Sequence, residues 1–308
     1  MATDLQHHFQ QLAQSQVPLW IDGWKYGLAL LNDGQQPDWS DTAATVAYLR
    51  TLQGLVKSDV ITLHVEDFYT YWIEKHPELL VAMGEKRRLG FALRTLLADA
   101  DARQQLDAII FGLCEGYKDT PVVLALPSPK QWITKAHCTA KAINNVQVTW
   151  DDAESASMYI ADFLRHFSQR AISGILLQDN AQCGPNSDND IARYQPILNI
   201  ADNYQWHVLI DGCQGDYSPS PRTGIAYSLQ SIDTHSAQQN SKFSPDDIIA
   251  TGLKLDLLHW RQVERSALLS AHFYFSTLPL DAKPEVILEK IAELKNASRL
   301  TPQEVSCP

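Results

Sequence analysis

The clearest pattern along the chain is a series of short apolar runs, each ending in polar or acidic residues. The run Val60–Phe68 shows it best, because four apolar or β-branched residues lead directly into His64, Glu66 and Asp67. Runs of this length, bounded by polar residues, are typical of buried strands. Seven others predict further strands: 17–22, 121–127, 173–180, 206–213, 225–233, 271–278 and, as the best candidate for the seventh strand in chain order, 253–258.

Segments with helical spacing of their apolar residues separate these runs. Asp41 or Ser40 is placed to cap a helix that follows it, because both residue types accept hydrogen bonds from the first turn. The predicted helices cover 4–16, 41–58, 77–117, 151–170, 191–204, a segment that begins near 244, and 283–295.

Seven or eight buried strands that alternate with amphipathic helices predict an α/β fold, a (β/α)8 barrel. We expect one barrel domain over 1–308, with an N-terminal helical extension at 1–16 and a C-terminal tail at 296–308. The alternative is a doubly wound open sheet. No glycine-rich dinucleotide or phosphate loop follows the first predicted strand, which argues against nucleotide-binding versions of that sheet.

Composition narrows the classes of partner. The net charge of −11 argues against binding nucleic acid, since no basic surplus is available to neutralise phosphates. No apolar run approaches the roughly 18–20 residues that cross a bilayer, and no signal-peptide pattern opens the chain, so we expect no membrane partner and a cytoplasmic location. The five cysteines include no CxxC pair and predict reduced thiols. Apolar helix faces on the barrel exterior are compatible with a homodimer.

The polar strand ends predict a site. Because the carboxyl ends of parallel strands meet at one rim, we expect the side chains there to surround a small-molecule substrate. Asp211 and Cys213 differ by two positions and therefore face alike. Turn formation and helix capping are the alternative roles for the acids. The residues at these ends are Asp22, Gln178, Asp179, Asn180, Asp211 and Cys213.

The end of the run Val60–Phe68 carries the strongest candidates. Glu66 and Asp67 are adjacent on a predicted strand, so only one of them points into the barrel, and His64 has the same parity as Glu66. The alternatives are a helix cap or structural ion pair for the acids and a buried, backbone-bonded imidazole for His64. Carboxylates that converge on an apolar mouth would raise the pKa of at least one of them and create a general acid. Trp24 is one of several aromatic residues that would either line such a pocket or pack in the hydrophobic core.

Four stretches resemble uroporphyrinogen decarboxylase. Pro121–Lys135, PVVLALPSPKQWITK, resembles its third-strand segment, and Pro18-Leu19-Trp20 its opening Pro-Val-Trp. Residues 59–66 are similar to its strand that ends in the catalytic aspartate, with Glu66 in that place, and 276–291 to its last strand and helix. The family shares a (β/α)8 barrel with cobalamin-independent methionine synthase and corrinoid methyltransferases, so the resemblance implies that fold.

Departures from the family limit the activity that the resemblance implies. The arginines that bind porphyrin carboxylates are replaced by Asp22-Gly23-Trp24-Lys25, Lys135 stands where a catalytic tyrosine would be, and Ser276 or Thr277 replaces a histidine. A porphyrin is therefore rejected as the substrate. The resemblance implies decarboxylation of a smaller aromatic or heteroaromatic acid without a cofactor, with Glu66 stabilising the cation formed when the ring is protonated.

The methyltransferase relatives imply an alternative. They bind zinc through His-x-Cys and a second cysteine, whereas this chain has Asp211-Gly212-Cys213 and no cysteine in the last predicted strand. Zinc held by Cys213, His64 and a carboxylate would support methyl transfer, and a barrel that only binds a small molecule is a third reading. The candidates are thus catalytic Glu66, Asp67, Asp211 and His64, substrate-binding Asp22, Trp24, Gln178, Asp179, Asn180 and Lys135, and metal-binding Cys213.

Overall fold

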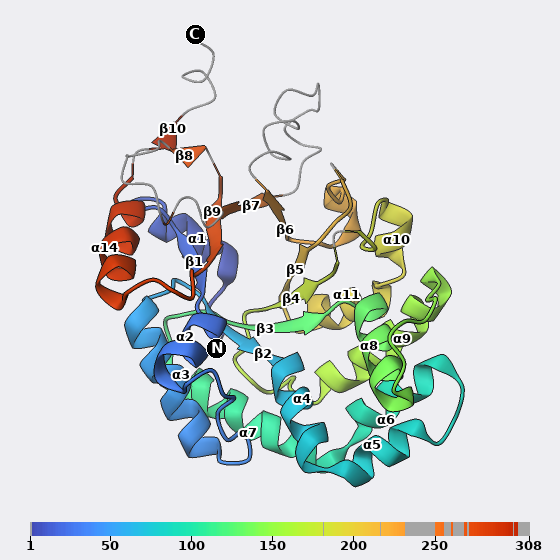
Figure 1. The fold of residues 1–308 in the computed structure, drawn as a ribbon. Helices are drawn as coiled ribbons and strands as arrows, with labels where there is room; N and C mark the ends of the chain where they lie inside the picture. The colour runs from blue at the N-terminus through green and yellow to red at the C-terminus, as the bar shows by residue number, and fades with distance from the viewer. Residues whose placement is uncertain are drawn as a thin grey trace.

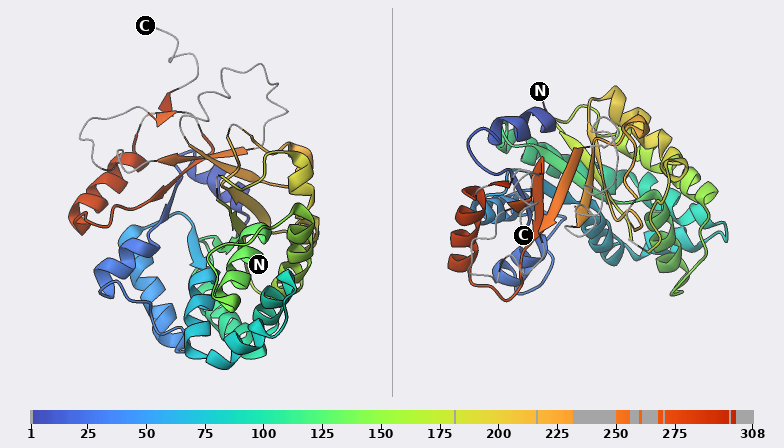
Figure 2. Two further views of the ribbon diagram at one scale, coloured as in Figure 1. Left: turned by 45° about the vertical axis from the view of Figure 1, so that its right-hand side comes forward. Right: turned by 90° about the horizontal axis from the view of Figure 1, so that it is seen from above.

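Eight parallel strands curve into a nearly closed barrel with helices around the outside, as Figures 1 and 2 show. The structure is a computed structural model and describes residues 2–180, 182–215, 217–231, 250–255, 260, 268–269, 271–297 and 299–300. The predicted (β/α)8 barrel is confirmed.

The strand order around the barrel is β1-β9-β7-β6-β5-β4-β3-β2, and every hydrogen-bonded pair is parallel. The seventh strand of the barrel begins three residues before the predicted 253–258. The two short strands β8 (Leu268–Leu269) and β10 (Arg299–Leu300) pair separately. The barrel strands are β1 (Leu19–Asp22), β2 (Ile61–His64), β3 (Val122–Pro127), β4 (Gly174–Gln178), β5 (His207–Asp211), β6 (Tyr227–Ser231), β7 (Ala250–Leu255) and β9 (Phe273–Thr277).

The predicted helices that lie within the described residues are present in order, and the helices over 24–31, 65–75 and 129–141 are additional to them. The predicted helix over 77–117 is three helices, that over 191–204 is divided into two helices over 188–192 and 195–203, and the one predicted near 244 lies outside the described residues. Among the described residues, no helix has both the length and the apolar character to cross a membrane. The helices are α1 (Leu5–Leu12), α2 (Trp24–Leu31), α3 (Thr42–Val56), α4 (Val65–Lys75), α5 (Pro77–Gly84), α6 (Leu89–Ala98), α7 (Ala100–Gly116), α8 (Pro129–Lys141), α9 (Trp150–Arg165), α10 (Asp188–Ala192), α11 (Gln195–Asn203), α14 (Pro284–Lys295) and the 3-10 turn η1 (Pro221–Thr223).

The prediction that Val60–Phe68 forms one strand is wrong beyond His64. The strand β2 ends at His64, and Val65 begins helix α4, so Glu66 and Asp67 lie in the first turn of that helix. Acidic residues in a first turn are favourable because the positive end of the helix dipole lies there. The strand parity assumed for Glu66 therefore does not apply.

Alternate strand residues fill the barrel interior. Phe9 of α1 stacks on Phe273 of β9, with ring centroids 4.3 Å apart, so the N-terminal helix closes one end of the barrel. The inner cluster includes Trp20, Ala125, Leu176, Leu209 and Leu229. Two residues further along each strand, the same inward parity brings polar side chains to the opposite end. We call this carboxyl end the barrel mouth.

The seam between β1 and β2 is closed mainly by side chains. Asp59 accepts a hydrogen bond from the backbone N–H of Leu19 at 2.7 Å, and Ser58 accepts one from Ile21 at 2.8 Å. The indole of Trp20 donates to the hydroxyl of Thr62 at 2.8 Å across the same seam. These contacts hold β1 and β2 together from their amino ends toward the mouth.

Candidate active site

Asp22 and His64 form a buried pair at the end of this seam. The distance from His64 Nε2 to Asp22 Oδ1 is 3.0 Å, and the side chains are only 13% and 11% exposed for Asp22 and His64, respectively. The ring of Trp24 stacks on the imidazole with centroids 5.7 Å apart, and the backbone N–H of Trp24 donates to Asp22 at 3.1 Å. The strand end and the first turn of α2 thus fix the orientation of both groups.

The two members of the pair shift each other's pKa. Burial alone would lower the pKa of His64, but the charge of Asp22 and the hydrogen bond to it, with Asp67 and Glu66 nearby, raise the pKa instead. Burial alone would raise the pKa of Asp22, but the charge and hydrogen bond of His64 outweigh that effect and lower it. The arrangement favours an imidazolium beside a carboxylate.

Glu66 and Asp67 occupy different surroundings from His64. Lys135 of α8 donates to both carboxylate oxygens of Glu66, at 2.6 and 2.8 Å, and the Glu66 side chain is 39% exposed. Asp67 accepts a hydrogen bond from the side chain of Gln36 at 3.0 Å. Glu66 and Lys135 are therefore brought together as a half-exposed ion pair, and Asp67 is tied to the segment before α3.

Asp211 is also paired, with a residue that the sequence did not reveal. Lys254 of β7 reaches over β6 to form an ion pair with Asp211 at the end of β5. Gln178 lies next to Asp211 in the register of β4 and β5. Asp22, Glu66 and Asp211 each lie within ion-pair distance of a basic side chain, so these three carboxylates are not left to repel one another at the mouth.

Asp179 has the environment expected of a carboxyl group whose pKa is raised. Burial raises the pKa of Asp179, although hydrogen bonds from Ser128, the backbone N–H of Asn180 and the hydroxyl of Tyr194 act in the opposite direction. The Tyr194 hydroxyl lies 3.1 Å and the Asn180 nitrogen 2.8 Å from the carboxylate. The Asn180 side chain also accepts from the backbone N–H of Gln182, as in a turn.

Cys213 lies beside this group as a neutral thiol. Burial, followed by the negative charges of Asp211 and Asp179, raises the pKa of Cys213 to about 12. A Cβ at Gly212 would lie 2.2 Å from the carbonyl oxygen of Asp179, so this glycine allows the loops after β4 and β5 to meet closely. In the part of the chain that the structure describes, no three His, Cys, Asp or Glu side chains are grouped closely enough to hold a metal ion.

Sequence reasoning missed three of the partners that shape this site. Lys254 and Tyr194 carry no local signal, because one lies in a strand of irregular pattern and the other at the junction of two short helices. Gln36 lies between predicted elements. Gly252 of β7 pairs with Leu229 of β6, and this register places Lys254, two residues further along β7, at the rim. The register is known only from the fold.

The fold has a clear counterpart, whereas the sequence has none. No protein-family model matches the chain, and a search of curated proteins finds no significant match. Among solved structures, the chain is similar to a methyltransferase from Methanosarcina mazei, with a TM-score of 0.58 and 11% sequence identity over 95% of this chain and 98% of that chain. At this identity, the similarity establishes a shared barrel architecture.

Proposed function

We propose that this chain is an enzyme that acts on a small organic acid at the barrel mouth, with His64 as the proton donor. The observation that carries the proposal is the buried Asp22–His64 pair at 3.0 Å. The raised pKa of His64 keeps a proton available near neutral pH, which is what general acid catalysis requires. The barrel also supports an enzyme, because catalytic groups in this architecture gather at the carboxyl ends of strands.

Decarboxylation is the reaction that this pair supports best. Since Nε2 of His64 is bonded to Asp22, Nδ1 is the nitrogen that would donate to a substrate. Its proton would add to the ring carbon that bears the carboxylate. The bond from that carbon to the carboxylate would then break, its electron pair would return to the ring, and CO₂ would leave. Each turnover takes up one proton, and Asp22 stabilises both charge states of the imidazole.

The other mouth residues would orient the substrate. The ammonium of Lys254 keeps donors beyond the one used by Asp211, and Gln178 offers both a donor and an acceptor. This assignment gives the main catalytic role to His64 and not to Glu66, which the resemblance to uroporphyrinogen decarboxylase implied as the stabiliser of the cation. The reason is that Glu66 is half-exposed and already neutralised by Lys135.

The test is a screen of small aromatic and heteroaromatic carboxylic acids for CO₂ release. His64→Gln should lower kcat by about 10²-fold or more, because a positioned general acid contributes that much. Glu66→Gln should have a smaller effect, and His166→Gln, at an exposed histidine of the helical layer, none. If the folded His64→Gln variant retains full activity, His64 is not the proton donor.

A second candidate is methyl transfer on a small molecule, favoured by one observation: the similar solved structure is a methyltransferase. The zinc chemistry of such enzymes needs several ligands at one place, and within the described residues Cys213 belongs to no group of three His, Cys, Asp or Glu side chains that could hold a metal ion. Elemental analysis of protein purified without added metal separates the candidates. Stoichiometric zinc would favour methyl transfer and count against the decarboxylase.

A further inference from the structure

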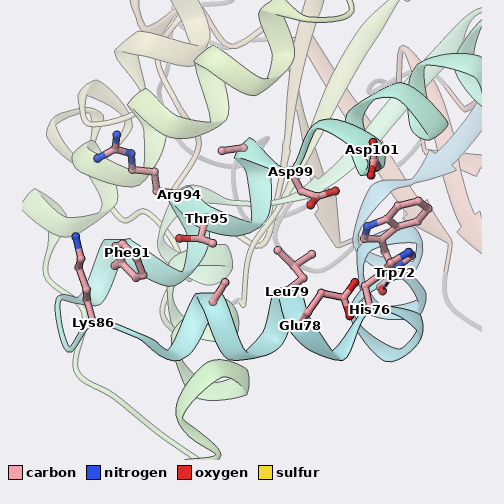
Figure 3. A pocket seen from close by; sticks show the side chains of 12 residues that line it. Trp72, His76, Glu78, Leu79, Lys86, Phe91, Arg94, Thr95, Asp99 and Asp101 are labelled. Atoms are coloured by element: carbon pink, nitrogen blue, oxygen red, sulfur yellow. Dashed lines mark hydrogen bonds between the residues drawn. The ribbon is translucent and has the colours of Figure 1, made fainter.

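A groove of about 580 Å³ lies outside the barrel, between the end of α4, the helices α5 and α6, and the start of α7 (Figure 3). Trp72 and Leu79 form part of its apolar lining and are buried, at 6% and 7% exposed. The lining also includes two short side chains, Ala82 and Ala98. None of its lining residues belongs to the barrel mouth.

The groove is built by helices that the barrel does not need. One helix is enough to connect neighbouring parallel strands, yet the chain places α4, α5, α6 and α7 between β2 and β3. The helix α6 packs against α8 and α9 and α5 packs against α8, so these two inserted helices form an additional outer layer. A groove in an inserted layer is a natural place for a function separate from the mouth.

Charges of opposite sign stand at the two ends of the groove. Lys86 and Arg94 lie at one end, and Asp99 and Asp101 at the other, with Glu78 pointing toward that acidic end (Figure 3). Among the described residues, none of these five side chains forms an ion pair. Asp99 also accepts a hydrogen bond from the backbone N–H of Ala102 as the N-cap of α7, and the Lys86 ammonium lies 4.9 Å from the centroid of the Phe91 ring. The charges of opposite sign are thus held apart at the two ends of the groove.

The helix geometry gives the spacing of the two ends. From Glu78 to the end of α5, and from Arg94 to Asp99 at the C-cap of α6, the rise of 1.5 Å per residue gives a separation along the helix axis of roughly 7.5–9 Å. An extended chain covers that distance in about three residues. The charge ends therefore match a basic and an acidic side chain placed three positions apart on an extended segment.

We propose that this groove binds an extended segment of a partner protein. The segment carries a basic side chain at Asp99 and Asp101 and an acidic side chain at Lys86 and Arg94. Apolar residues between them rest on Trp72 and Leu79. Charge complementarity carries the proposal, because charges of opposite sign at the two ends of the groove steer such a segment and fix its direction. The interaction is independent of the chemistry proposed for the mouth.

The probe is a dye-labelled peptide, Lys-Leu-Leu-Glu, with acetyl and amide ends, followed by fluorescence anisotropy at low salt. Lys-Leu-Leu-Lys and Glu-Leu-Leu-Glu serve as comparison peptides. The wild-type chain should bind the mixed-charge peptide at least about tenfold more tightly than either comparison peptide, since each of those meets one repulsive end. Raising the salt concentration should weaken the binding.

Charge reversal supplies the decisive test. The double variant Lys86→Glu and Arg94→Glu should bind the mixed-charge peptide at least about tenfold more weakly than the wild-type chain does. It should now bind Lys-Leu-Leu-Lys most tightly of the three peptides. A variant that gains a peptide is folded, so the preference switch cannot arise from misfolding. Arg87→Glu with Arg88→Glu makes the same change in net charge beside the groove, outside its lining, and should keep the wild-type preference.

Two outcomes would overturn the proposal. Equal binding of all three peptides to the wild-type chain would show that the charge ends select nothing. Equal loss in the groove variant and in the Arg87 and Arg88 variant would show that only net charge matters.

Discussion

His64 Nε2 lies 3.0 Å from Asp22 Oδ1, although the residues are 42 positions apart and end two different strands. The strands β1 and β2 share the one seam of the barrel that side chains close, so the pair depends on that closure. The candidate chemistry of the mouth and the stability of the barrel are therefore linked at the same place.

The pair should give stability a specific pH dependence. Because the pKa of His64 is raised above 6.5, its stabilisation is complete below pH 6.5 and is lost as the pH rises through the raised pKa. Because the pKa of Asp22 is lowered below 3.8, the stabilisation that Asp22 contributes to the fold is present above pH 3.8 and is lost as the pH falls through the lowered pKa. The pair should stabilise the fold most between these two values.

Urea unfolding of the wild-type chain and Asp22→Asn measures this effect. At pH 5.5 the variant should lose roughly 1–3 kcal/mol of unfolding free energy, because it leaves the imidazolium without its charged partner. At pH 9 the difference should shrink. An identical difference at both values would mean that His64 stays neutral throughout.

Asp59 should be essential for closing the barrel. Its carboxylate accepts from the backbone of Leu19 at 2.7 Å and from Lys295 of α14 at 2.6 Å, and its side chain is 8% exposed. Asp59→Ala should lower the unfolding free energy by about 2–4 kcal/mol, since it leaves the Leu19 amide without a partner and the Lys295 ammonium without its counter-charge. The exposed Asp119→Ala should change it by less than about 0.5 kcal/mol. A similarly small effect at Asp59 would show that the seam does not need this carboxylate.

Much of the fold could be predicted from the sequence because a barrel strand is buried on both faces and therefore appears as a continuous apolar run. Pro121–Pro127 was predicted as a strand and forms β3 (Val122–Pro127). The end of β2 could not be predicted, because an apolar run followed by Glu66 and Asp67 fits either a continuing strand or the first turn of a helix. Only packing decides, and here Val65 and Phe68 are buried at helical spacing.

The candidate site was predictable only in part. The strand ends placed Asp22, His64 and Asp211 at one rim, which follows from parallel topology alone. Their partners were not predictable, because the ion pair between Asp211 and Lys254 depends on the registers of three strands. Whether an acid is free or neutralised decides its chemistry, so the sequence could nominate residues but not assign roles.

Gly252 should tolerate no side chain. A Cβ at this position in β7 would lie 2.3 Å from Cζ of Phe273, whose ring fills the barrel interior. Gly252→Ala should therefore cost about 1–3 kcal/mol of unfolding free energy through overpacking. Gly54→Ala is the matched control, because nothing lies within 4 Å in helix α3 and alanine should stabilise that helix by roughly 0.5–1 kcal/mol. Adding Phe273→Leu to Gly252→Ala should cost less than the sum of the single changes, and strict additivity would argue against the predicted clash.

Cys213 should react slowly. Burial and the nearby Asp211 and Asp179 raise its pKa to about 12, so almost no thiolate forms at neutral pH, whereas Cys183 is exposed. Iodoacetamide at pH 7.5, followed by mass spectrometry of the modified peptides, should label Cys213 at least about tenfold more slowly than Cys183, since the thiolate is the reactive species. Equal labelling rates would mean that Cys213 carries an accessible thiolate, and burial would then not protect this thiol as the structure indicates.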